Sequence, residues 1–159
     1  MGMPGVNWER ELKPIMKDAG FRKKGKSWYL ESPETVAVLN LQWSSWGGGD
    51  FYINLGILVK SIEAIQWPPE YKCHFRRRLS DLMPDWRRAR ALFHIEEGFP
   101  IDQEIRRQEV LDAVRTLALP FLRRCGTVAD LRTLLKENPK LHYDATAQLL
   151  EYIGIPNTR

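Results

Sequence analysis

Residues 36–60 of the chain read VAVLNLQWSSWGGGDFYINLGILVK, and this stretch decides the fold. Two runs rich in β-branched and aromatic residues lie on either side of three consecutive glycines. The pattern is typical of a β-hairpin, because such residues favour strands and glycine permits a tight reversal of the backbone. We therefore predict two antiparallel strands joined by a loop centred on Gly48.

The register of this hairpin follows from the alternation of side chains along a strand. With Gly48 at the centre, the apolar residues of both strands share one face, and a slip of one residue would mix apolar with polar side chains. The other face is largely polar, and Gln42 is expected opposite Asn54 on it. The expected apolar pairs are Trp43 with Ile53, Leu41 with Leu55, Leu39 with Ile57, and Ala37 with Val59.

Two further strands are predicted outside the hairpin. Residues 27–31 form one of them, and pairing Glu31 with Val36 puts Trp28 on the same apolar face as the hairpin. Residues 73–79 have an ambiguous period, and an extended edge segment is favoured over a helix. The basic run at residues 22–26 is predicted to be a solvated connector.

Helical spacing of apolar residues appears at both ends of the chain. A helix is predicted from Asn7, its N-cap, to the stop at Gly20. A long helix is expected from Asp102, kinked or ended at Pro120, and shorter helices follow the cap at Thr127 and span roughly residues 144–153.

Together these elements predict an α+β fold. An antiparallel meander of three to four strands carries the N-terminal helix and the C-terminal helices on one face. Residues 1–125 are predicted to form this domain, and residues 126–159 a C-terminal helical extension packed on it.

Composition limits the function classes. The chain has 159 residues, 24 basic and 20 acidic side chains, and a net charge of +4. No apolar leader or membrane span is apparent, so we expect a cytoplasmic protein. The spacing of the two cysteines, Cys73 and Cys125, matches no metal-binding motif. Cys73 and His74 cannot act as a nucleophile and its base, because neighbouring strand residues point to opposite faces. We predict no metal, cofactor or catalytic residue, and an enzyme is the less favoured class.

The polar face of the sheet is the first candidate site. Asparagine is depleted in strands, so Asn40 and Asn54 in strand centres, with Gly56 beside them, are unusual. Amide and cationic side chains could bind a carboxylate or phosphate, although a plain solvated sheet face gives the same pattern. The candidate ligand-binding residues are Asn40, Gln42, Asn54, His74, Arg76 and Arg78.

Exposed tryptophans are the second candidate site. Six tryptophans occur in the chain, and side-chain parity places Trp28 and Trp43 in the core. Trp46 at the hairpin tip, Trp67 before two prolines, and Trp86 in an arginine-rich segment are the candidate anchors for a partner. For Trp67, packing in the core or within a turn is the favoured alternative to this exposed role. Carboxylates interrupt the arginine-rich segment, which makes nucleic acid a disfavoured partner.

Short motifs follow one another along the chain in a fixed order: GFRKKG at residues 20–25, WY at 28–29, NLQ at 40–42, SSWG at 44–47, INLG at 53–56, CH at 73–74, RL at 78–79 and LPFL at 119–122. As an ordered set, these motifs resemble the bacterial domain of unknown function 4304 family. The resemblance spans roughly residues 8–125 and implies no catalytic residue, but Gln42, Asn54, Gly56, His74 and Arg78 fall on its pattern positions.

Small α+β proteins of this kind are also similar to immunity proteins, which block a toxin by binding it. The favoured function is therefore a protein-binding module that occludes the surface of a partner. Because the chain is basic, such a toxin would be acidic or not a nuclease. The alternative is a binder of, or an enzyme acting on, a small anionic ligand at the polar face.

Overall fold

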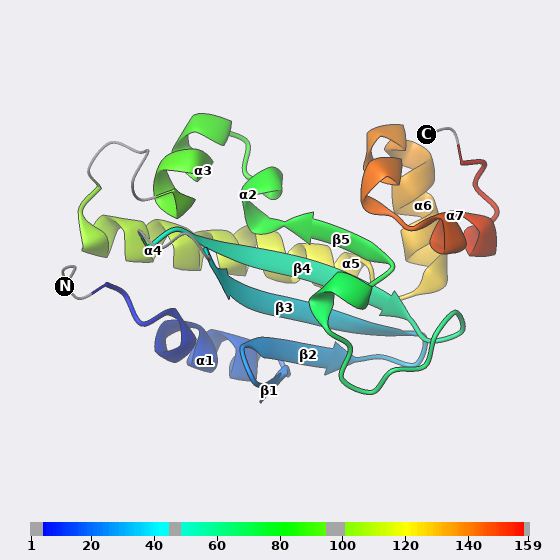
Figure 1. The fold of residues 1–159 in the computed structure, drawn as a ribbon, viewed down its shortest axis with the longest axis horizontal. Helices are drawn as coiled ribbons and strands as arrows, with labels where there is room; N and C mark the ends of the chain where they lie inside the picture. Colours follow the sequence, from blue (N-terminus) through cyan, green and yellow to red (C-terminus); the bar gives the residue numbers. More distant parts are fainter. Residues whose placement is uncertain (1–4, 45–48, 95–100, 158–159) are drawn as a thin grey trace.

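The sheet is a five-stranded antiparallel meander in the order β1-β2-β3-β4-β5. The computed structural model describes residues 5–44, 49–94 and 101–157, and Figure 1 shows the sheet at its centre. The α+β class is confirmed, with one more strand than the upper number predicted. The strands are β1 (Arg22–Lys24), β2 (Ser27–Glu31), β3 (Thr35–Trp43), β4 (Phe51–Val59) and β5 (Phe75–Arg78).

The additional strand is β1, part of the segment predicted to be a connector. Gly25 has a positive φ of 62°, a conformation that glycine adopts without steric cost. The chain reverses there, and Lys24 pairs with Ser27 and Arg22 with Tyr29. All three residues of β1 are exposed, as suits a short, cationic edge strand.

The helices begin at the caps that the sequence indicated. Side chains of Asn7, Asp102 and Thr127 accept hydrogen bonds from the first turns of α1, α4 and α6. The elements are α1 (Trp8–Asp18), η1 (Glu70–Lys72), α2 (Leu79–Leu82), α3 (Trp86–Phe93), α4 (Gln103–Ala113), η2 (Val114–Ala118), α5 (Leu119–Arg124), α6 (Val128–Glu137), η3 (Pro139–Asp144) and α7 (Ala147–Ile153).

The helix continues past Pro120, but its backbone is irregular on the N-terminal side of that residue. The π-helical turn η2 lies just before it, and the Leu119 amide donates to Val114 five residues back. Proline has no N–H to donate in the helical ladder. The wider turn shifts the hydrogen-bond register, and the helix then continues to Arg124.

The hairpin register differs from the predicted one by two residues. Trp43 pairs with Phe51 and Asn40 with Asn54, so the loop is centred one residue earlier and Gln42 faces Tyr52 instead of Asn54. A shift of two residues preserves which side chains share a face. The predicted faces are therefore correct, as is the predicted pairing of Glu31 with Val36.

The apolar face of the sheet carries the core. Residues of β3 and β4 form one buried cluster with Leu12 and Met16 of α1 and with Val110 and Leu122 of α4 and α5. Figure 1 shows α4 and α5 running behind the sheet. This arrangement confirms helices at both chain ends covering one face.

Trp43 was predicted to be in the core, but its side chain is 41% exposed. It is the last residue of β3, where the sheet ends. Phe51 takes the buried position opposite it and stacks on Trp8 with ring centroids 4.8 Å apart. Trp28, in the middle of β2, is buried as predicted.

Residues after 125 form hydrogen bonds with the sheet and with residues that flank its strands. Thr35 donates its hydroxyl to the Gly126 carbonyl, and the Val128 amide donates to the Glu34 carboxylate. The Thr146 amide donates to the His74 carbonyl. The division of the chain near residue 125 stays a prediction. Among the helices of the described residues, none is long and apolar enough to cross a membrane.

Candidate functional site

The second face of the sheet is divided into a covered half and an open half. In the covered half, Val38 and Leu58 are fully buried beneath the chain that follows β4. A Cβ atom on Gly56 would lie 2.7 Å from the Sγ atom of Cys73, so only glycine allows this close approach. Trp67 packs edge-on against Tyr29 in this half, with ring centroids 5.1 Å apart.

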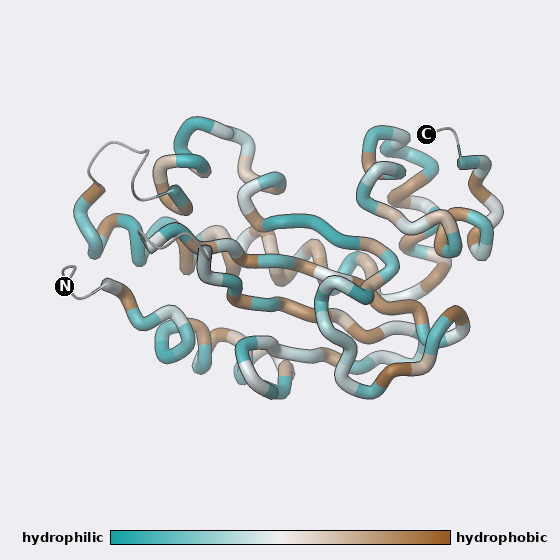
Figure 2. The backbone as a smooth tube through the Cα atoms, in the orientation of Figure 1, coloured by the Kyte–Doolittle hydropathy of each residue, from teal (hydrophilic) through white to brown (hydrophobic). Residues whose placement is uncertain are grey.

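The open half is a polar groove, and we use this name for the cavity of about 680 Å³ over β3, β4 and β5. In Figure 1, α2 and α3 lie above one end of β5, and the C-terminal helices lie above the other. Figure 2 colours most of β5 as hydrophilic, since three arginines follow its first residue, Phe75. The groove is lined by Gln42, Tyr52, Asn54, Glu70, Arg76, Arg77, Arg78, Ser80, Asp81, His94, Tyr143, Asp144, Ala145 and Thr146.

The floor of the groove is a chain of hydrogen-bonded amides. Asn40 donates to the Ser27 hydroxyl at 2.9 Å. The Nδ2 group of Asn54 donates to Asn40 Oδ1 at 3.2 Å and to Gln42 Oε1 at 2.9 Å. The Oε1 atom of Gln42 accepts from Asn54, so the two N–H groups of Gln42 Nε2 are the donors that this side chain offers to a ligand. The predicted residues Asn40, Gln42 and Asn54 are thus brought together.

Two of the three arginines of β5 are paired with carboxylates. Arg76 donates to both oxygens of Glu70, at 2.9 and 3.1 Å, and this bond raises the Arg76 pKa. Arg77 Nε lies 3.3 Å from Asp144 Oδ2. That Arg77 nitrogen is buried and has no hydrogen-bond partner among the described residues, so the contact is an ion pair without hydrogen-bond geometry. Burial of the Asp144 carboxyl raises its pKa, which Arg77 opposes.

Arg78 is the exception among the three arginines. Its guanidinium lies over the ring of Tyr52, 4.1 Å from the ring centroid. Within the described parts of the chain, no carboxylate forms an ion pair with this guanidinium. Asp81 accepts from the backbone amide of Arg78 at 3.3 Å. Stacking on an aromatic face leaves the in-plane N–H groups of an arginine available to bind oxygens.

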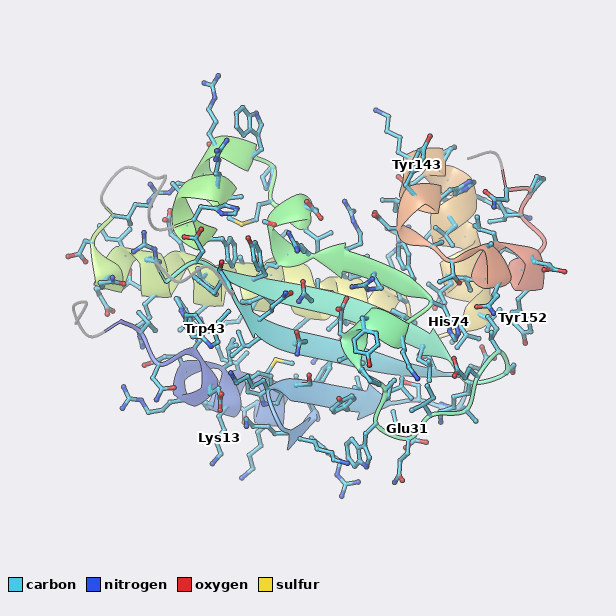
Figure 3. All side chains as sticks on the ribbon, viewed as in Figure 1. Lys13, Glu31, Trp43, His74, Tyr143 and Tyr152 are labelled. Atoms are coloured by element: carbon cyan, nitrogen blue, oxygen red, sulfur yellow. The ribbon has the colours of Figure 1, made fainter. Side chains whose placement is uncertain are left out.

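His74 does not line the polar groove. Its side chain is 2% exposed, and its Nδ1 atom accepts a hydrogen bond from the Val59 amide at 2.9 Å. Figure 3 shows His74 at the end of the sheet near the C-terminal helices. Burial lowers its pKa. The sequence analysis named His74 as a candidate ligand-binding residue, but β5 begins only at Phe75. His74 instead connects β4 to the chain entering β5 through its hydrogen bond with Val59.

His94 lines the groove, although the sequence gave no sign of it. Its Nδ1 atom lies 3.3 Å from Asp50 Oδ2, and its ring meets that of Tyr52 edge-on at 5.7 Å. His94 follows α3 and is far from the sheet in sequence. No pattern along the chain could have joined it to the polar face.

The tryptophan candidates fall into different environments. Trp46 lies outside the described residues. Trp67 is half-buried against Tyr29, as the turn-packing alternative expected. Trp86 is 64% exposed on α3 and lines a smaller cavity of about 310 Å³ together with His94 and Asp81. Of the two that can be placed, Trp86 is the more exposed, and the Arg87 guanidinium lies over its ring at 5.3 Å from the centroid.

The fold and this groove define a small α+β protein with a polar, arginine-containing depression on the sheet. The chain belongs to the family described as Domain of unknown function (DUF4304), whose model matches residues 12–124. This confirms the resemblance noted from the short motifs. No curated protein and no solved structure matches the chain.

Proposed function

We propose that this chain is a binding protein that holds an anionic group, a carboxylate or a phosphate, in the polar groove. The main support is the environment of Arg78, which stacks on Tyr52 and has no carboxylate partner among the described residues. Its two neighbours, Arg76 and Arg77, have one carboxylate partner each. A ligand oxygen would supply the acceptors that this guanidinium lacks.

The amide floor supports the same ligand chemistry. Gln42 presents N–H donors, because its oxygen is occupied by Asn54. Donors from Gln42 and Arg78 would therefore meet the same anion. The candidate residues Asn40 and Arg76 act in this proposal as supports, one orienting Asn54 and the other held by Glu70.

A panel of anions tests the proposal. Phosphate, succinate and citrate are added at constant ionic strength, with succinamide as the neutral control, and the melting temperature is measured. Bound ligand at 100-fold its Kd stabilises by about 2.7 kcal/mol, which is roughly 5–11 °C for a domain of this size. The Arg78→Gln variant should lose this shift and Arg22→Gln, on the exposed strand β1, should keep it. Equal shifts in both variants would refute the site.

A protein partner is the second candidate function, and the exposed aromatic side chains beside the groove favour it. Trp86 and Tyr143 are 64% and 74% exposed, and such residues are common at the centres of protein interfaces. In its concrete form, the chain is an immunity-type module of the bacterial cytoplasm that occludes an acidic toxin. The net charge of +4 suits that partner.

Mixing purified chain with a candidate toxin tests the second function. We expect a stoichiometric complex. If Trp86 is an anchor, Trp86→Ala should reduce the binding free energy of that complex by about 2 kcal/mol or more. A complex whose affinity is unchanged by Trp86→Ala and Arg78→Gln would place the interface elsewhere.

A further inference from the structure

We propose that the occupant of the polar groove is an extended peptide segment of a partner protein, with one acidic side chain bound by Arg78. This inference rests on the proposed anion site and names what carries the anion. The occupant must fit the length of the groove, its charge and its walls.

The groove continues beyond the anion site at both ends. A cavity of about 310 Å³ shares Ser80, Asp81 and His94 with it. At the other end, a cavity of about 360 Å³ shares Gln42, Asn54 and Arg76 with it. The three cavities therefore adjoin one another, and we call them together the trough, which extends from α2 and α3 over β5, β4 and β3. A lone phosphate or carboxylate would fill only its middle.

The charge of the trough disfavours a polyanion. Among its lining residues, the cations of β5 are accompanied by the carboxylates of Glu70, Asp81 and Asp144. A nucleic-acid strand brings one negative charge per nucleotide and needs a succession of cations. Arg78 is the arginine of β5 that has no carboxylate partner among the described residues, which suits a ligand with one acidic group. A peptide that is otherwise neutral meets this condition.

The walls of the trough suit a peptide chain. The Nε2 group of Gln42 offers the same N–H donors as a peptide group, whereas the Nδ2 group of Asn54 is already bonded to Asn40 and Gln42. Each cavity also has one exposed aromatic side chain at its wall. These are Trp86 in one end cavity, Tyr143 in the middle, and Tyr71 in the other end cavity, exposed by 64%, 74% and 67%.

Aromatic side chains spaced along an amide-lined trough can hold successive side chains of an extended segment. An extended chain rises about 3.3 Å per residue and turns alternate side chains to one side. Recognition of this kind takes affinity from main-chain bonds and specificity from side-chain subsites. Figure 3 shows Tyr143 at the upper edge of the molecule, on the side of the C-terminal helices.

Selection from a random-peptide library tests the inference on the full chain. Peptides of about ten residues, spanning roughly 33 Å when extended, are displayed and enriched. The enriched sequences should share an Asp or Glu at one position. Binding of a selected peptide, followed by fluorescence anisotropy, should weaken at least about tenfold in Arg78→Gln and in Trp86→Ala.

Two matched variants serve as controls. Tyr152→Ala removes an aromatic side chain that is 46% exposed on α7, and Arg22→Gln removes a cation of β1. Both should bind the peptide as the unmodified chain does. Circular dichroism of all four variants checks that each is folded, which is expected because the altered side chains are exposed.

The outcomes separate this inference from the anion site itself. If phosphate or succinate stabilises the chain through Arg78 but no acidic peptide is enriched, the peptide proposal falls and the anion site stands. If neither small anions nor peptides depend on Arg78, both fall. Binding of an oligothymidine strand in preference to the selected peptides would also overturn the peptide proposal.

Discussion

Replacing Gly56 by alanine should destabilise the fold through one identifiable contact. The added Cβ atom would lie 2.7 Å from the Sγ atom and 2.9 Å from the Cβ atom of Cys73. An ordinary contact is about 3.5–4.0 Å, so the two segments must separate by roughly 1 Å. Overpacking of this kind typically costs about 1–3 kcal/mol.

Cys73 has little freedom to move away. The next residue, His74, forms two hydrogen bonds with β4. Its backbone amide donates to the Ile57 carbonyl, and its Nδ1 atom accepts from the Val59 amide. The Gly56→Ala variant should therefore unfold with a melting temperature lower by roughly 2–4 °C for each kcal/mol lost. Urea denaturation gives the free energy directly.

The cause can be isolated by a double-mutant cycle. Cys73→Ala removes the nearer of the two atoms, so the cost of Gly56→Ala should fall by about 1 kcal/mol in that background. Gly5, whose added Cβ would meet nothing within 4 Å, provides the control. Equal effects of Gly5→Ala and Gly56→Ala, with no coupling to Cys73, would show that the chain after β4 does not lie on this face of the sheet.

Three further predictions concern buried groups. Burial lowers the His74 pKa, so the unfolded chain, with an ordinary histidine pKa of about 6.5, binds more protons below that pH. The unfolding free energy should then fall as pH drops from about 7 to 5, by at most about 1.4 kcal/mol per pH unit. His74→Asn keeps an acceptor for the Val59 amide and should flatten the pH dependence of the unfolding free energy, measured by urea titration. The raised pKa of Asp144 changes that free energy in the opposite direction, and it does so equally in both proteins. Identical pH profiles of the two proteins would contradict the role of His74. Burial raises the pKa of Cys73 and Cys125 to about 12, so neither thiol should react with a chromogenic disulfide near pH 8 until denaturant is added, and rapid labelling of the native protein would be the contrary result. Arg106 is 3% exposed and donates to the Leu92 and Ala91 carbonyls at the end of α3; Arg106→Met leaves both acceptors unpaired and should cost about 2–4 kcal/mol, against at most about 0.5 kcal/mol for the exposed Arg115→Met.

The sheet could be predicted because its information is local. Alternation in β2, β3 and β4 fixed which residues share a face, and even the two-residue error in the hairpin left those faces unchanged. The period of residues 73–79 was ambiguous, but an extended edge segment was favoured there, and Arg76 and Arg78 lie opposite Gly56 and Asn54. β1 was missed because lysine is depleted in strands and because the pairing of β1 depends on the reversal at Gly25.

The walls of the groove could not be predicted because they come from distant parts of the chain. His94 follows α3, and Tyr143 and Asp144 belong to η3. Their positions depend on how the helices pack, which has no signature in the alternation of a strand. The covered half of the second face was missed for the same reason. Val38 and Leu58 are apolar there because the chain after β4 folds over them.

Arg78 and Gln42 are proposed to bind an anion together in the polar groove. The most direct test follows the NMR signals of the Arg78 Nε–H and of the Gln42 and Asn54 side-chain amides while succinate or phosphate is added at constant ionic strength. Saturable shifts of these signals, with the buried Trp28 indole signal unmoved, are the expected result. Shifts confined to the lysines and arginine of β1, or no saturable shift at all, would contradict the account.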